Sequence, residues 1–294
     1  MNVIVQADHI IPEEMAKIQN QVESRTVKTE MITNETTYSI TSKISTTHYW
    51  PTELRMMITL RSILYLLFLL VTIILYGLSI GIFGWILPYQ WVTRIGQHWG
   101  KVNLRALELI CGLSYRIQGE ENLPSSTCIV LCKHQSVWET IALRALLPPE
   151  HTWVLKRELL WAPFLGWALA AYRPITIDRG NTYRSIQKLL RQGKYWLDKG
   201  NWIVIFPEGT RVASGKRQDY NRGGAILAQK TGYPVLPIAH NAGVFWLRRD
   251  LKKYPGEITL VIGKLLDPAG LSSTEINRYV EEWIEETVDK LPRK

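Results

Sequence analysis

A run of 26 residues without a charged side chain, from Ser62 to Leu87, constrains the fold of this chain more than any other feature. As a helix, a run of that length extends roughly 39 Å, enough to cross a hydrocarbon core of about 30 Å. We therefore expect a membrane-bound protein. Glycines at positions 77, 81 and 84 permit close packing or a bend, and residues 88–113 form an amphipathic, basic pattern. The sequence thus leaves two arrangements open, a helix that spans the bilayer and a helical pair that enters one leaflet.

The chain divides into three parts around this run. Residues 1–56 are polar and rich in Thr and Ser, which is typical of a disordered tail or of sequence upstream of the true start, because Met56 and Met57 directly precede the apolar run. Residues 57–111 are expected to form a membrane-anchoring helical segment. Residues 112–294 are expected to form an α/β domain.

The charge of the chain favours an anionic partner. Lys and Arg number 35 against 26 Asp and Glu, and the excess lies after residue 50. A phospholipid surface or a phosphorylated metabolite fits this charge. No nucleic-acid recognition motif accompanies it, so we expect no nucleic-acid partner.

The three cysteines, Cys111, Cys128 and Cys132, show no metal-ligand spacing. An odd number of cysteines also argues against a disulfide scaffold and for a reducing compartment. We expect neither a metal site nor a disulfide.

After Cys111, short apolar segments alternate with helical patterns. Strands are predicted at residues 115–119, 127–132, 152–156, 174–178, 202–206, 234–239 and 258–263. Helices are predicted near residues 136–147, 158–170, 182–199, 222–231 and 273–291, and the apolar stripe of the last helix is expected to be core packing. Strands that alternate with helices predict a mostly parallel sheet flanked by helices, whose ligands gather beyond the carboxyl ends of the strands.

Polar residues follow three of these strands, and by the strand-end rule they could line one crevice. They are Lys133, His134 and Glu139 after the second strand, Asp178 and Arg179 after the fourth, and Glu208, Thr210 and Arg211 after the fifth.

The stretch "LCKHQSVWET", residues 131–140, supports two interpretations. In one, His134 is a general base and Glu139 is the carboxylate that orients it, a pair suited to removing the proton of a hydroxyl that attacks an acyl thioester. In the other, Ser136 and Glu139 form the capping box of an ordinary helix. The two are compatible if His134 lies in the turn and Glu139 in the first helical turn. A lone His at such a position is more often structural than catalytic.

The stretch "FPEGTR", residues 206–211, places a carboxylate, a glycine turn, a hydroxyl and an arginine next to one another. Arginine binds phosphate through a bidentate fork, and backbone N–H groups in such a turn add to that grip. Taken alone, the same residues also fit a surface turn with an exposed arginine.

Taken together, these blocks resemble the 1-acylglycerol-3-phosphate acyltransferase family. The family blocks appear in order as "HQSVWE", "KRELLWAPFLGW", "ITIDRG", "FPEGTR" and "GYPVLPIAHNAG", within about residues 58–265. Two positions depart from the family pattern: the acid of the first block is Glu139 where Asp is usual, and Lys133 stands where Asn is frequent.

The resemblance implies a role for each matched position. It implies that His134 is the catalytic base and Glu139 its partner, and that Lys156 lies near the acyl-chain tunnel. It also implies a phosphate-binding group formed by Glu208, Gly209, Thr210, Arg211 and Arg179, with Lys216 and Arg222 as weaker candidates.

The expected activity is transfer of a fatty acyl group from acyl-CoA or acyl-carrier protein, as co-substrate, to the 2-hydroxyl of 1-acylglycerol-3-phosphate. The product would be phosphatidic acid, made at the cytosolic face of a membrane without a cofactor. Three alternatives remain open: another lysolipid or glycerol-3-phosphate as acceptor, Cys132 as an acyl-accepting nucleophile, and a non-catalytic membrane lipid-binding protein.

Overall fold

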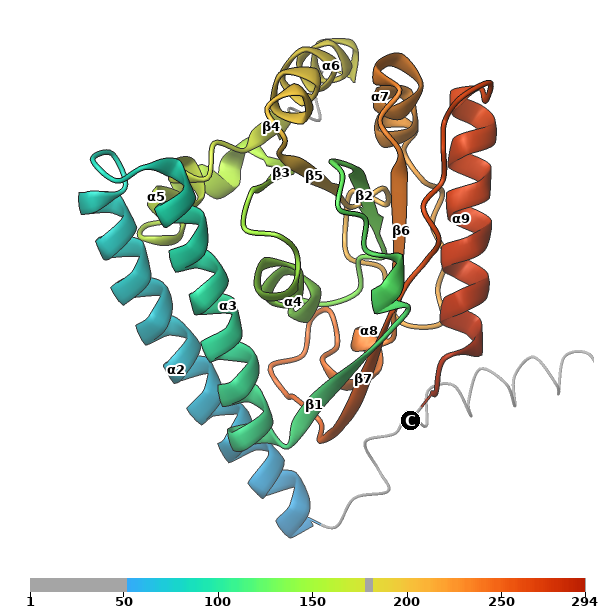
Figure 1. Cartoon of the computed structure of the whole chain (residues 1–294). Coiled ribbons are helices and arrows are strands. Elements are labelled where there is room, and N and C mark those ends of the chain that lie inside the picture. The colour runs from blue at the N-terminus through green and yellow to red at the C-terminus, as the bar shows by residue number, and fades with distance from the viewer. Residues whose placement is uncertain (1–51, 178–181, 294) are drawn as a thin grey trace, which may run out of the picture. The chain divides into compact units, whose positions relative to one another are not determined.

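The computed structural model describes residues 52–177 and 182–293 (Figure 1). Residues Met56–Lys294 form one compact unit, which contains every described element except the first four residues of helix α2. The predicted polar tail lies outside the described residues, and so do Asp178 and Arg179.

A seven-stranded sheet forms the centre of this unit, in the order β1-β7-β6-β2-β5-β3-β4. Only β6 and β7 pair antiparallel among the described strands, so the prediction of a mostly parallel sheet is confirmed. All seven predicted strands are present: β1 Leu113–Gln118, β2 Ile129–Cys132, β3 His151–Lys156, β4 Ile175–Ile177, β5 Trp202–Ile205, β6 Val235–His240 and β7 Gly256–Ile262.

Helices cover both faces of the sheet (Figure 1). Along β2, Val130 and Cys132 belong to the core on one face, whereas Ile129 and Leu131 belong to the core on the other. This alternation follows from the two-residue period of a strand, and it explains why a strand buried on both faces reads as continuously apolar. The helices that pack on the sheet are α4 Trp138–Leu146, α6 Thr182–Asp198, α7 Gly223–Thr231, α8 Ala242–Phe245 and α9 Ser273–Lys290.

The helix predicted at 158–170 is instead two short pieces, the 3-10 helix η2 Arg157–Trp161 and helix α5 Leu165–Ala171. Pro163 and Phe164 separate them, and Phe164 has a φ of 61°. Proline has no N–H to continue a helical ladder. Gly166 allows the two pieces to approach closely, because a Cβ at that position would lie 2.2 Å from the Leu160 carbonyl oxygen.

Two long helices precede the sheet, α2 Thr52–Phe83 and α3 Tyr89–Cys111. They lie side by side in Figure 1, and the Asn103 side chain contacts Thr72 between them at 3.3 Å. One face of α2 packs on the rest of the unit along half of the helix, from Ser62, which accepts a hydrogen bond from the Lys253 N–H, to Gly77, which lies against Phe164. The other face exposes large apolar side chains, namely Leu60, Ile63, Leu64, Leu67, Leu70, Val71, Leu75, Ile82 and Phe83.

Candidate active site

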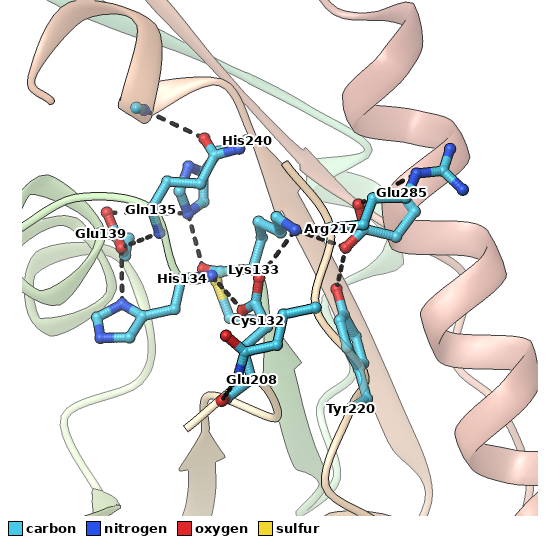
Figure 2. A network of polar contacts seen from close by, with 12 residues as sticks. Cys132, Lys133, His134, Gln135, Glu139, Glu208, Arg217, Tyr220, His240 and Glu285 are labelled. Carbon is cyan, nitrogen blue, oxygen red and sulfur yellow. Dashed lines mark hydrogen bonds and ion pairs between the residues drawn. The ribbon is translucent and has the colours of Figure 1, made fainter. Parts of the chain in front are cut away.

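His134 and Glu139 meet where β2 ends and α4 begins. His134 lies in the turn after the strand, and Glu139 lies in the first turn of the helix. His134 Nδ1 is 2.8 Å from Glu139 Oε1, so the predicted contact between the two side chains is present (Figure 2). Because Nδ1–H donates to the carboxylate, Nε2 keeps its lone pair and is the nitrogen available as a base.

The Glu139 carboxylate also anchors the start of the helix. Its Oε1 accepts hydrogen bonds from the backbone N–H groups of Gln135 and Ser136, at 2.8 and 2.7 Å. The Ser136 hydroxyl accepts from Trp138 N–H at 3.3 Å, so the capping box is only half formed. One carboxylate oxygen therefore contacts both the imidazole and the helix terminus, so the contacts that the two interpretations require occur together, and the role of His134 as a base stays a prediction.

Glu139 is completely buried and carries its charge because of these partners. Burial raises its pKa, but the hydrogen bond from His134 and the backbone N–H of Ser136 act in the opposite direction, and the net shift of the Glu139 pKa is downward. His240 lies 3.9 Å from Glu139 Oε2. Its Nε2 lies 2.9 Å from the Lys133 carbonyl oxygen and its Nδ1 accepts from Ala242 N–H, an arrangement that fits only a neutral imidazole with the proton on Nε2. Burial lowers the His240 pKa accordingly.

The ring of His134 is fixed on its flat side as well as at Nδ1. Phe206 stacks on it with the ring centres 4.1 Å apart and an angle of 14° between the planes. The His134 side chain is 17% exposed. An aromatic face also attracts a cation, so Phe206 favours the imidazolium that forms when Nε2 takes up a proton.

The loop after β5 holds the backbone of His134 on both sides. Glu208 Oε2 accepts a hydrogen bond from the His134 N–H at 2.8 Å, and the His134 carbonyl accepts from Val212 N–H at 2.7 Å. The loop that carries "FPEGTR" and the turn that carries the histidine are thus joined at two points. This places Arg211, the residue before Val212, beside the histidine turn.

Glu208 was predicted to contact substrate, yet its carboxylate is completely buried and lies 2.8 Å from Lys133 Nζ. Burial raises the Glu208 pKa to about 7, although Lys133 and the His134 N–H lower it. The geometry gives Glu208 an internal role in holding His134, and a direct contact between Glu208 and substrate stays a prediction.

The other predicted phosphate-binding residues are partly brought together. Gly209 has a φ of 65°, a left-handed conformation that suits glycine, and its N–H closes the turn onto the Phe206 carbonyl. Thr210 and Arg211 follow directly, both partly exposed. Lys156 is exposed at the carboxyl end of β3, whereas Arg179 lies outside the described residues.

Arg248 was missed in the sequence, because its neighbours Arg249, Asp250, Lys252 and Lys253 are charged too and no motif marks it. Its guanidinium donates to the Thr210 hydroxyl at 3.3 Å, which adds a second partly exposed arginine to the "FPEGTR" loop. Arg222, one of the weaker phosphate candidates, points elsewhere and donates to Thr274 of α9.

The structure disfavours Cys132 as a nucleophile. The side chain is completely buried, and burial, with Glu139 and Glu208 nearby, raises the Cys132 pKa well above its ordinary value. A thiol in that environment is not ionised near neutral pH. Within the described ranges, no three His, Cys, Asp or Glu side chains are grouped as a metal site.

The chain is similar to known proteins over most of its length. Residues 114–241 match the family model described as Acyltransferase. The chain is 40% identical to the 1-acyl-sn-glycerol-3-phosphate acyltransferase of Pseudomonas aeruginosa over 79% of this chain and 91% of that protein, and 27% identical to the coconut (Cocos nucifera) protein of the same name over 70% of this chain and 68% of that protein.

A solved structure shares the fold. The crystal structure of the 1-acyl-sn-glycerophosphate (LPA) acyltransferase PlsC from Thermotoga maritima superposes with a TM-score of 0.66, covering 79% of this chain and 94% of that chain at 24% identity. At that identity the likeness shows the fold alone, whereas the Pseudomonas protein is similar enough over most of its length to show the family. The chain is an acyltransferase and belongs to the 1-acyl-sn-glycerol-3-phosphate acyltransferase family.

Proposed function

We propose that the protein transfers a fatty acyl group from an acyl thioester to the 2-hydroxyl of 1-acylglycerol-3-phosphate, yielding phosphatidic acid. The observation that carries this proposal is the His134–Glu139 contact of 2.8 Å, which leaves Nε2 of a partly exposed imidazole free to act as a base. The acceptor is inferred from the name of the Pseudomonas and coconut relatives, which are both 1-acyl-sn-glycerol-3-phosphate acyltransferases.

The chemistry requires one base and no covalent enzyme intermediate. His134 Nε2 removes the proton of the acceptor hydroxyl while the oxygen attacks the thioester carbonyl, and Glu139 stabilises the imidazolium that forms. The tetrahedral intermediate then expels the thiolate. Thiols ionise near pKa 8.5, so the thiolate is a good leaving group, and it receives the proton from the imidazolium. Acyl-CoA and acyl-carrier protein supply the same thioester, and either serves as donor in this scheme.

The phosphate of the acceptor would be held by the loop next to the base. Arg211 and Thr210 follow the left-handed turn at Gly209, and Arg248 approaches the same hydroxyl. A doubly charged phosphate monoester suits two guanidinium groups, since each forms a bidentate pair with phosphate oxygens. Lys156 and Arg179, both predicted at neighbouring strand ends, would add positive charge to this site.

Helix α2 would attach the enzyme to its lipid substrate. It is long and apolar enough to cross a membrane. However, the α/β unit packs against α2 from Ser62 to Gly77, which at 1.5 Å per residue is about 22 Å of its length. A helix so covered on one side cannot cross the bilayer without drawing the sheet into lipid. We therefore favour the arrangement in which α2 and α3 enter one leaflet, with the active site at the cytosolic face.

The decisive experiment is mass spectrometry of the products formed by purified protein from three acceptors: lysophosphatidic acid, glycerol-3-phosphate and a lyso-aminolipid. Each acceptor is offered with acyl-CoA and with acyl-carrier protein. Phosphatidic acid from lysophosphatidic acid supports the proposal, whereas a product only from another acceptor overturns the acceptor assignment. The His134→Ala variant is the control, because it should abolish turnover while vesicle binding through α2 persists.

A further inference from the structure

A buried cluster of charged groups lies directly behind the catalytic turn. Lys133 Nζ is 2.8 Å from Glu208 Oε1 and 2.5 Å from Glu285 Oε1, and the Tyr220 hydroxyl donates to Glu285 Oε1 at 3.0 Å (Figure 2). Lys133 and Glu208 are completely buried, and the Glu285 side chain is 7% exposed. Arg217 approaches the outer oxygen of Glu285 at 3.9 Å.

These residues come from distant parts of the chain. Lys133 directly follows β2, Glu208 lies in the loop after β5, and Glu285 lies on α9, 152 residues beyond Lys133. Glu285 follows Ile284, which packs in the apolar core that α9 shares with the sheet. The predicted core packing of α9 is present, and it holds one carboxylate against the sheet.

Burial makes the pairing of these charges compulsory. A buried ammonium or carboxylate is costly unless an opposite charge and hydrogen bonds compensate it, and removal of one partner leaves the other uncompensated. Here the Lys133 ammonium lies between the carboxylates of Glu208 and Glu285. If the ammonium moved away, both carboxylates would stay buried without this charged partner. The position of Lys133 is therefore set from two sides, by Glu208 and by Glu285.

This cluster reaches the catalytic histidine through two short paths. Lys133 precedes His134 in the chain, so fixing Lys133 limits where the histidine backbone can lie. Glu208, which holds Lys133 through Oε1, accepts the His134 N–H through Oε2. The carbonyl of Lys133 also contacts His240, which lies behind Glu139.

We propose that Glu285 of α9 is a positioning residue for His134, acting through Lys133 and Glu208 to hold the imidazole in line with the acceptor hydroxyl. The inference rests on the proposed function, in which His134 is the base. It assigns a part in the reaction to a residue of α9, a helix that carries neither His134 nor the "FPEGTR" loop. A misplacement of a base by about 1 Å costs up to roughly 100-fold in rate.

The test compares Glu285→Gln with Glu286→Gln, a matched change at the exposed neighbouring position of the same helix. Glu285→Gln should lower kcat between about 10- and 100-fold with KM changed less than about threefold, while Glu286→Gln stays near wild type. Unchanged kcat in Glu285→Gln would overturn the proposal, because a merely stabilising contact alters the melting temperature and not the turnover of the folded protein.

A double variant keeps the test sound if single variants fold poorly. Lys133→Met leaves two buried carboxylates without their cation and should be the most damaging change. Adding Glu285→Gln removes one of these carboxylates, so the double variant should recover kcat relative to Lys133→Met. A double variant whose loss of activity equals the combined losses of Lys133→Met and Glu285→Gln would count against the coupling.

A readout without turnover separates this inference from the proposed reaction. Selective ¹⁵N labelling of histidine reports the backbone N–H of His134, identified by its loss in His134→Gln. Its resonance should shift in Glu285→Gln and stay in place in Glu286→Gln. If the wild type transfers no acyl group, the proposed function fails and this resonance still decides whether Glu285 positions His134.

Discussion

Replacement of Glu139 by glutamine probes the centre of the site with almost no change of shape. The amide oxygen keeps an acceptor at the position of Oε1, where His134 Nδ1 and two backbone N–H groups converge at 2.7–2.8 Å. The helix start and the tautomer of the imidazole should therefore survive. What disappears is the negative charge that faces the imidazolium.

The size of the loss follows from the geometry of the pair. Opposite unit charges about 4 Å apart interact by about 4 kcal/mol at an effective dielectric constant of 20. The amide dipole retains part of this, and hydrogen bonds to charged groups contribute about 1.5–3 kcal/mol. A loss of about 2–4 kcal/mol lowers kcat roughly 30- to 1,000-fold, since each 1.4 kcal/mol is tenfold in rate. The charge that Glu139 faces develops as Nε2 takes up the hydroxyl proton in the reaction, so KM should change little.

The assay is steady-state acyl transfer by purified protein in lipid vesicles, with the melting temperature recorded in parallel. Glu257→Gln, on the exposed side of β7 in an ion pair with Arg116, is the matched control and should keep full activity. A Glu139→Gln variant that folds normally and turns over within threefold of wild type would refute the carboxylate's role. An equal loss in Glu257→Gln would show that the substitution acts through stability instead.

Three further predictions concern the surroundings of the base. Phe206→Leu should lower kcat about 3- to 30-fold with KM retained, because the ring stacked on His134 favours the imidazolium; an unchanged kcat would contradict this. Arg248→Gln should raise KM for a phosphorylated acceptor at least about tenfold through the loss of a charge beside Thr210, and equal effects on a phosphate-free acceptor would count against it. Glu208, whose pKa burial raises from 4.5 to about 7, binds more protons in the folded state than in the unfolded state across that window. The free energy of unfolding should therefore fall by about 3 kcal/mol as the pH rises from 4.5 to about 7. The melting temperature of the Glu208→Gln variant should lack this dependence on pH, and the same dependence in the variant and the wild type would refute the assignment.

The sheet could be predicted from sequence because its signals are local. Each strand is a short apolar run between turn residues, and each crossover helix follows from the period of its side chains. The split between η2 and α5 was missed, since the apolar pattern continues through it. In the sequence, only Pro163 marked the break. The close approach of Gly166 to Leu160 becomes visible only in the folded chain.

The contact between His134 and Glu139 could be predicted because five residues separate them and a helix start fixes their geometry. The pairing of Lys133 with Glu285 could not be predicted, because 152 residues separate them and nothing near either residue indicates the other. In the sequence, Lys133 stands where the family often has Asn, and Glu285 is one of several acidic residues of the last helix. Likewise, the buried position of Glu208 depends on how two loops meet, which a motif does not encode.

The Lys133–Glu285 pair also orders events during synthesis of the chain. At about 5–20 residues per second, the 152 residues between the two take about 8–30 s to make. Glu208 is made about halfway through that interval, and from then until Glu285 follows it is the one carboxylate of the two paired with Lys133 that can balance the lysine. The second carboxylate arrives last, when α9 docks on the sheet. Ribosome-bound chains that end before residue 285 should therefore contain a formed sheet and a histidine that is not yet held in its working position.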